Sequence, residues 1–120
     1  MAALLSRQAI LDAKDLPTQI VDVPEWNGSV IVRTLTGEER DNLEATTLVQ
    51  KGKKMSVNLS NFRARLVSLS VVDQQGKAIF TESDVELLGK KSAIALDRVA
   101  KVAQELSGLR EDDVEKLTKN

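Results

Sequence analysis

Residues 59–72 read LSNFRARLVSLSVV, and this stretch decides the fold. On a helix turning by about 100° per residue, its apolar side chains fall into two stripes on nearly opposite sides. One stripe holds Leu59, Phe62, Leu66 and Leu69, and the other holds Ala64, Val67 and Val71. A helix that is apolar on two sides must be covered on two sides. We therefore predict a central helix over residues 59–72, capped by Asn58 or Ser60, with the rest of the chain around it.

A β-hairpin is predicted over residues 18–34. Residues 18–23, TQIVDV, and residues 29–34, SVIVRT, are both rich in β-branched side chains. They flank Asn27-Gly28, and Asn-Gly between two such runs is the strongest short-range hairpin signal. A lone hairpin is marginally stable in water, so this one should lie across the central helix, with Trp26 closing one end.

Helices are predicted on both sides of the hairpin. Residues 6–13 form a short helix with Ser6 as cap, and so short a helix needs packing to persist. Thr36 and Glu39 have the spacing of a capping box and open a helix that runs to about residue 49. Residues 50–55, QKGKKM, then form an exposed and mobile loop.

The C-terminal third is predicted to be helical. Thr81 caps a short helix that ends near Leu88, and Ser92 caps a long helix over residues 93–106 with a clean apolar face. Ser107-Gly108 supplies the stop, and residues 110–120 form a polar tail whose short helix frays. The fold class is thus α+β, mostly α-helical, with a small β-hairpin packed on a bundle of about four to five helices in one domain, 1–120.

Composition argues against enzymatic activity. The chain has 120 residues, a net charge of −1, no cysteine and no histidine. It therefore has no thiolate nucleophile, and it lacks the commonest general base and metal ligand. Acidic pairs such as Glu38-Glu39 stand at predicted helix starts, where the helix dipole explains them. We predict a protein without catalytic residues, cofactor or metal.

No stretch approaches the ~18 consecutive apolar residues of a membrane span, and no basic segment precedes the N-terminal apolar residues as in a signal peptide. The expectation is a soluble, intracellular protein.

Five residues are candidates for binding another protein. Trp26 lies in the hairpin turn, and tryptophan is enriched at interface hot spots; its other interpretation is a lid on the core beside Pro24. Ile94 is the one apolar residue on the polar side of the last long helix, where single exposed apolar side chains are also common. Lys51, Lys53 and Lys54 could order on a partner, or form a solvated loop.

Four segments resemble the tail assembly chaperones of long-tailed (siphovirus-type) bacteriophages and prophages. They are V-P-E-W-x-G at 23–28, T-G-x-E-R at 36–40, V-D-x-x-G-K-x-x-F-T-x-x-D-V at 72–85 and L-G-K-K-S-A at 88–93. The similarity extends over almost all of residues 4–110. It implies a small, non-catalytic α+β protein of the bacterial host cytoplasm that is absent from the finished virion.

The resemblance also implies partners. Such chaperones hold the long helical tape measure protein soluble while the tail tube forms, and a frameshifted, extended product often helps to recruit the tube protein. From the size of the chain we expect weak homo-oligomers, because one core of this size offers little surface to a long client.

Two other functions stay open at this stage. One is a small structural head–tail connector or tail protein of the particle. The other is a nucleic-acid-binding regulator that uses Lys51, Lys53, Lys54, Arg63 and Arg65, and no aromatic residue is interleaved with these lysines.

Overall fold

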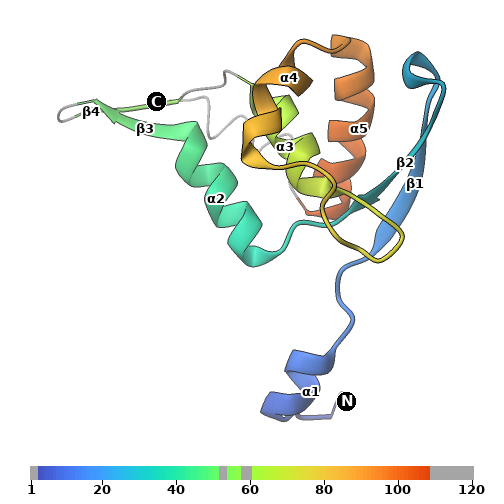
Figure 1. Ribbon diagram of the computed structural model, residues 1–120. Coiled ribbons are helices and arrows are strands. Elements are labelled where there is room, and N and C mark those ends of the chain that lie inside the picture. Colours follow the sequence, from blue (N-terminus) through green and yellow to red (C-terminus); the bar gives the residue numbers. More distant parts are fainter. Residues whose placement is uncertain (1–2, 52–53, 58–60, 109–120) are drawn as a thin grey trace.

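A computed structural model describes residues 3–51, 54–57 and 61–108, with the backbone alone described at 48–51 and 54–57. The elements follow one another as α1 (Arg7–Asp12), β1 (Thr18–Val23), the 3-10 turn η1 (Pro24–Trp26), β2 (Gly28–Arg33), α2 (Gly37–Thr47), β3 (Leu48–Lys51), β4 (Lys54–Val57), α3 (Phe62–Ser70), β5 (Val71–Val72), η2 (Glu82–Asp84), α4 (Val85–Gly89) and α5 (Ala93–Leu106). Within these residues the chain is α+β and mostly α-helical, as predicted (Figure 1).

The N-terminal hairpin forms where the sequence predicts it. β1 and β2 pair antiparallel from Thr18↔Arg33 to Val23↔Gly28. The turn is η1, and Asn27 follows it in the left-handed conformation at φ 56°, which asparagine tolerates well. Val21, Val23 and Val32 point to one face of this sheet and are buried against the helices.

α3 is the central helix, but it is shorter than predicted. It spans Phe62–Ser70 instead of 59–72, and it packs against α2, α4 and α5. Val71 and Val72 leave the helix as strand β5 and pair with Val32 and Ile31, so the hairpin gains a third strand. β-Branched residues suit this change, and pairing with β2 satisfies backbone groups that a helix end would leave open.

The start of α3 also differs from the prediction. Asn58, Leu59 and Ser60 lie outside the described residues, and Asn61 occupies the N-cap position at φ 59°.

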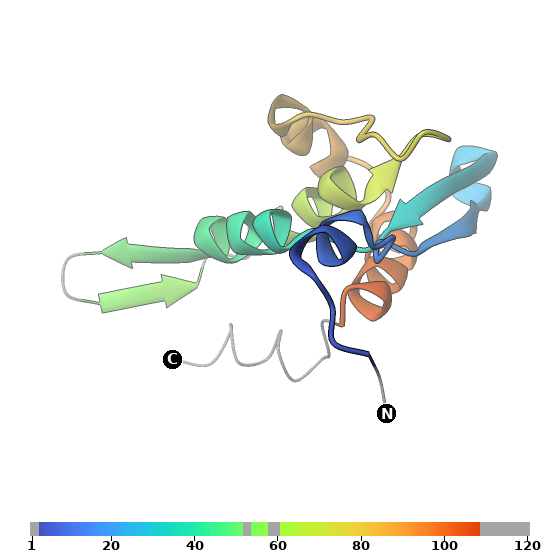
Figure 2. The same ribbon diagram turned by 90° about the horizontal axis from the view of Figure 1, so that it is seen from below.

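The segment after α2 is a second correction. The sequence predicts helix to residue 49 and a loop over 50–55, whereas α2 ends at Thr47 and β3 pairs with β4 from Leu48↔Val57 to Lys51↔Lys54. Figure 2 shows this second hairpin extending from the end of α2. Lys53 and the tail at 110–120, with its expected short helix, lie outside the described residues.

α5 joins the sheet to the helices. It packs against α3 on one side and against β1 and β2 on another. Its buried side chains are those of the predicted apolar face: Ala95, Leu96, Val99, Ala100 and Ala103. The Ser92 hydroxyl accepts from the Ala95 N–H at 3.2 Å, and Gly108 follows the helix at φ 69°, so both predicted ends are confirmed.

Candidate protein-interaction surface

A surface groove of about 440 Å³ runs between the start of α3 and one side of α5. Its buried lining residues are apolar: Phe62, Ala64 and Leu96. The exposed lining is mostly polar: Arg63 Nε lies 3.3 Å from Asp97 Oδ1, and Lys91 also lines the groove. The groove therefore has a narrow apolar floor, whose three side chains each expose less than a tenth of their surface, and a charged rim. Such a surface suits the apolar stripe of another helix.

The end of α4 and the start of α3 approach each other closely at the groove. Gly89, the last residue of α4, lies beside Asn61, and both line the groove. A Cβ placed on Gly89 would lie 2.3 Å from Asn61 Oδ1, closer than real Cβ contacts come. A larger residue at 89 would therefore require the Asn61 side chain to move.

The sequence model of the phage tail assembly chaperone family matches residues 6–119. The chain belongs to this family. The structure of the bacteriophage HK97 tail assembly chaperone superimposes with a TM-score of 0.59 at 21% identity, covering 82% of this chain and 94% of that one. No curated protein matches the sequence. The predicted family resemblance is confirmed, and the likeness to the HK97 protein shows a shared fold.

In this tail assembly chaperone Trp26 is half-buried and packs against the core. Glu25 beside it accepts from Arg98 Nη2 at 3.0 Å, which ties η1 to α5. A backbone N–H and then the Arg98 guanidinium hold the pKa of Glu25 below its ordinary value of 4.5. The turn is therefore anchored to α5, and Trp26 has only part of its surface left for a partner.

Ile94 is an exposed apolar residue, as predicted, with 67% of its surface accessible. It directly follows Ala93, which lines the groove, in the first turn of α5. Ile94 itself is not part of the lining.

Of the five basic residues in the nucleic-acid hypothesis, the structure describes the side chains of Arg63 and Arg65. Lys51 and Lys54 end β3 and begin β4. Arg63 pairs with Asp97 and Arg65 pairs with Glu82, so two of the five cations of the nucleic-acid hypothesis are neutralised within the chain. These pairings do not favour phosphate binding.

The sequence did not reveal the groove, because its floor residues belong to apolar stripes that also build the core. We also did not predict that the N-terminal helix stays uncovered. Ile10 and Leu11 of α1 are more than half exposed, and Leu4 and Leu5 before it are exposed as well. These four large apolar residues, close together in a short segment, were the signal in the sequence that the segment exposes apolar side chains.

The described part of the chain contains no group of three acidic side chains placed to hold a metal ion. No helix in that part is long and apolar enough to span a membrane.

Proposed function

We propose that this chaperone binds the tape measure protein and keeps it soluble while the tail tube assembles, without catalysing a reaction. Membership of the tail assembly chaperone family supports the role. The groove between α3 and α5 is the observation that carries the choice of client, since a tape measure is long and largely helical and exposes apolar stripes.

The dimensions of the groove fit a helix. Its lining on α5 extends from Ala93 to Gln104. Eleven residues of helix rise about 16 Å, which is about three turns. A client helix lying along α5 would place its i, i+3, i+4 and i+7 apolar side chains over Phe62, Ala64 and Leu96, with the charged rim in water.

One groove of this size binds weakly, so the function requires many copies. Three turns of helix bury far less than the ~1,200 Å² of a stable protein–protein interface. Copies that also contact one another gain affinity through effective concentration. We therefore propose homo-oligomers that coat the tape measure in the cytoplasm of the infected or lysogenic host. The major tail tube protein is the second partner, recruited through an extended product, and the chaperone leaves before the virion is complete.

Co-expression with the tape measure protein tests the client, followed by size-exclusion chromatography with light scattering. We expect a client that is insoluble alone to elute as a soluble complex with many copies of this chain. A client that gains no solubility contradicts the proposal. Finding the chain in purified particles would instead support a structural tail protein.

A matched pair of variants tests the groove. Ala93→Glu places a charge in the groove, whereas Ile94→Glu places it one residue further, outside the lining. Both lie in the first turn of α5, where a carboxylate suits the helix dipole, so both should fold. We expect Ala93→Glu to weaken client binding at least tenfold and Ile94→Glu to leave it within about twofold. If Ile94→Glu instead weakens client binding more than Ala93→Glu does, the client binds at Ile94 and not in the groove.

A further inference from the structure

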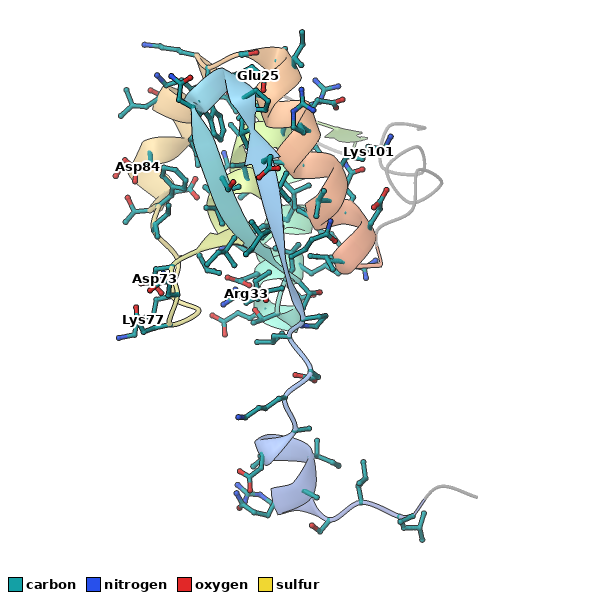
Figure 3. The ribbon with its side chains drawn as sticks, turned by 90° about the vertical axis from the view of Figure 1, so that its right-hand side faces the viewer. Glu25, Arg33, Asp73, Lys77, Asp84 and Lys101 are labelled. Carbon is teal, nitrogen blue, oxygen red and sulfur yellow. The ribbon has the colours of Figure 1, made fainter. Side chains whose placement is uncertain are left out.

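The N-terminal arm, residues 3–16, stands away from the rest of the molecule. Figure 1 and Figure 3 show α1 beyond the end of the sheet, joined to β1 by an extended segment. No residue of α1 is buried. The large apolar side chains of the arm each expose between 40% and 102% of their surface: Leu4, Leu5, Ile10, Leu11 and Leu16.

Local bonds hold the helix of the arm together, but they are too few to maintain it alone. The Ser6 hydroxyl accepts from the Ala9 N–H at 3.1 Å, and Gln8 Nε2 donates to Asp12 at 2.9 Å. A six-residue helix is far below the ~12 residues at which isolated helices become marginally stable in water. The apolar side chains of the arm therefore need a surface to pack on.

The arm is attached beside one end of the groove between α3 and α5. The Pro17 carbonyl accepts from the Thr34 N–H at 3.0 Å, and the Thr34 hydroxyl donates to the Leu106 carbonyl at 3.0 Å. These two bonds hold the first residue after the arm at the C-terminal end of α5. Gln104, the last residue of α5 that lines the groove, stands just before Leu106 in the same helix. The arm therefore leaves the molecule close to where the lining on α5 ends.

The arm is long enough to pass round α5 and lie over the groove. Residues 13–16 span about 13 Å when extended, and the backbone at Ala13 is already extended. The helix α1 adds about 9 Å. Together these lengths exceed the ~10 Å diameter of a helix, so α1 can cross the end of α5 while Pro17 stays bonded to Thr34.

The apolar surface that the groove lacks is present on the arm. The three side chains of the groove floor expose 1% to 8% of their surface, whereas Ile10 and Leu11 of α1 expose 57% and 61%. So small an exposed floor cannot cover the large side chains of the arm. A helix lying in the groove turns its other side outward, and apolar side chains on that side would meet the arm. The arm therefore suits a client helix in the groove better than the empty groove.

We propose that the arm closes over a client helix that lies in the groove, with Ile10 and Leu11 packed on the side of that helix that faces away from α3. The partner is a helix with apolar side chains on two sides, one for the groove floor and one for the arm. Closure adds apolar burial that the floor does not supply, and it orders a helix too short to persist alone. The inference rests on the proposed function and adds a second contact with the client.

A matched pair of double variants tests the contact. Ile10→Gln with Leu11→Gln removes two exposed apolar side chains from α1 and keeps its helix propensity. Ile20→Gln with Ile79→Gln removes two of similar exposure, 69% and 52%, outside the arm and the groove lining. The probe is the tightest-binding member of a set of overlapping synthetic peptides that covers the tape measure protein, and fluorescence polarisation measures its affinity. We expect the arm variant to bind it at least tenfold more weakly and the control to bind it within about twofold of the wild type.

Equal binding by the wild type and the arm variant would overturn the closure of the arm and leave the proposed client standing. An equal loss in both double variants would also overturn it, because exposed apolar side chains outside the arm would then matter as much. If no peptide binds the wild type, the proposed client fails together with the arm contact, so the two failures are distinguishable.

Spin labels report the closure itself, because the natural chain has no cysteine. Ala9→Cys on α1 is combined with Lys101→Cys on α5, an exposed position outside the groove lining that Figure 3 labels. Labelled protein is diluted with unlabelled protein, so that the measured distance lies within one copy. We expect the peptide to shorten this distance and to leave the distance between Ile20→Cys and Lys101→Cys unchanged, since β1 packs against α5. An unchanged distance to α1, or a short distance that lengthens when the peptide binds, would overturn the proposal.

Discussion

Glu39 shows how one carboxylate serves two purposes at the residue scale. Its Oε1 accepts from the Thr36 N–H at 2.9 Å, as the capping box predicted, and the Thr36 hydroxyl accepts from the Glu39 N–H at 3.1 Å. The same oxygen lies 2.5 Å from Arg33 Nη2, an ion pair that is largely shielded from water. Arg33 also donates to the Gly76 carbonyl, so this carboxylate links α2, the end of β2 and the loop after β5.

We expect Glu39→Ala to lower the free energy of unfolding by about 2 kcal/mol, because it leaves a shielded guanidinium and a backbone N–H without their acceptor. Glu38→Ala is the matched control: Glu38 is exposed in the same helical turn, and its loss should cost only about 0.5 kcal/mol. Urea unfolding followed by circular dichroism measures both. Equal losses would show that the dipole of α2, and not these bonds, accounts for the effect.

At the scale of elements, the sequence predicts those helix ends and turns that depend on neighbouring residues in the chain. The hairpin over residues 18–34, the Thr36 and Ser92 caps and the stop at Gly108 depend on residues close together in the sequence, and all are confirmed. β5 and the β3–β4 hairpin depend on pairing with partners that periodicity does not identify, so the sequence placed helix and loop there. The groove and the uncovered arm were missed for a related reason: the sequence shows that a side chain is apolar, but not what covers it.

The contact between Glu25 and Arg98 ties the hairpin turn to α5, and its stabilising effect should depend on pH. Folding lowers the pKa of Glu25, so the folded state favours the carboxylate. That contribution is present above the unfolded pKa, near 4.5, and is lost as the pH falls through the lower folded pKa.

We therefore expect Glu25→Gln to be less stable than the wild type at about pH 7, and the difference to shrink as the pH falls through the lowered folded pKa of Glu25. Urea midpoints across this pH range measure the difference. A difference that does not change with pH would mean that the charge of Glu25 does not hold η1 to α5. Ser29→Ala, elsewhere in the hairpin, provides a control that keeps the Glu25 carboxylate.

At the scale of the whole molecule, the described part of the chain exposes apolar side chains in two separate places. The groove between α3 and α5 is concave and charged at its rim, which suits a helix of a client. The exposed apolar side chains of α1 and of the segment before it lie elsewhere on the chain. If the proposed homo-oligomers form through contacts outside the groove, each groove stays open to the tape measure, so self-association and client binding reinforce each other.

The number of copies bound per client tests this account most directly. Light scattering of complexes with a full-length tape measure protein, and with one shortened to about half, gives the two stoichiometries. A chaperone that coats its client at one groove per few helical turns should show a copy number that falls by about half with the shorter client. An equal copy number on both clients would mean that the chaperone binds one fixed site, and would contradict the coating of the tape measure.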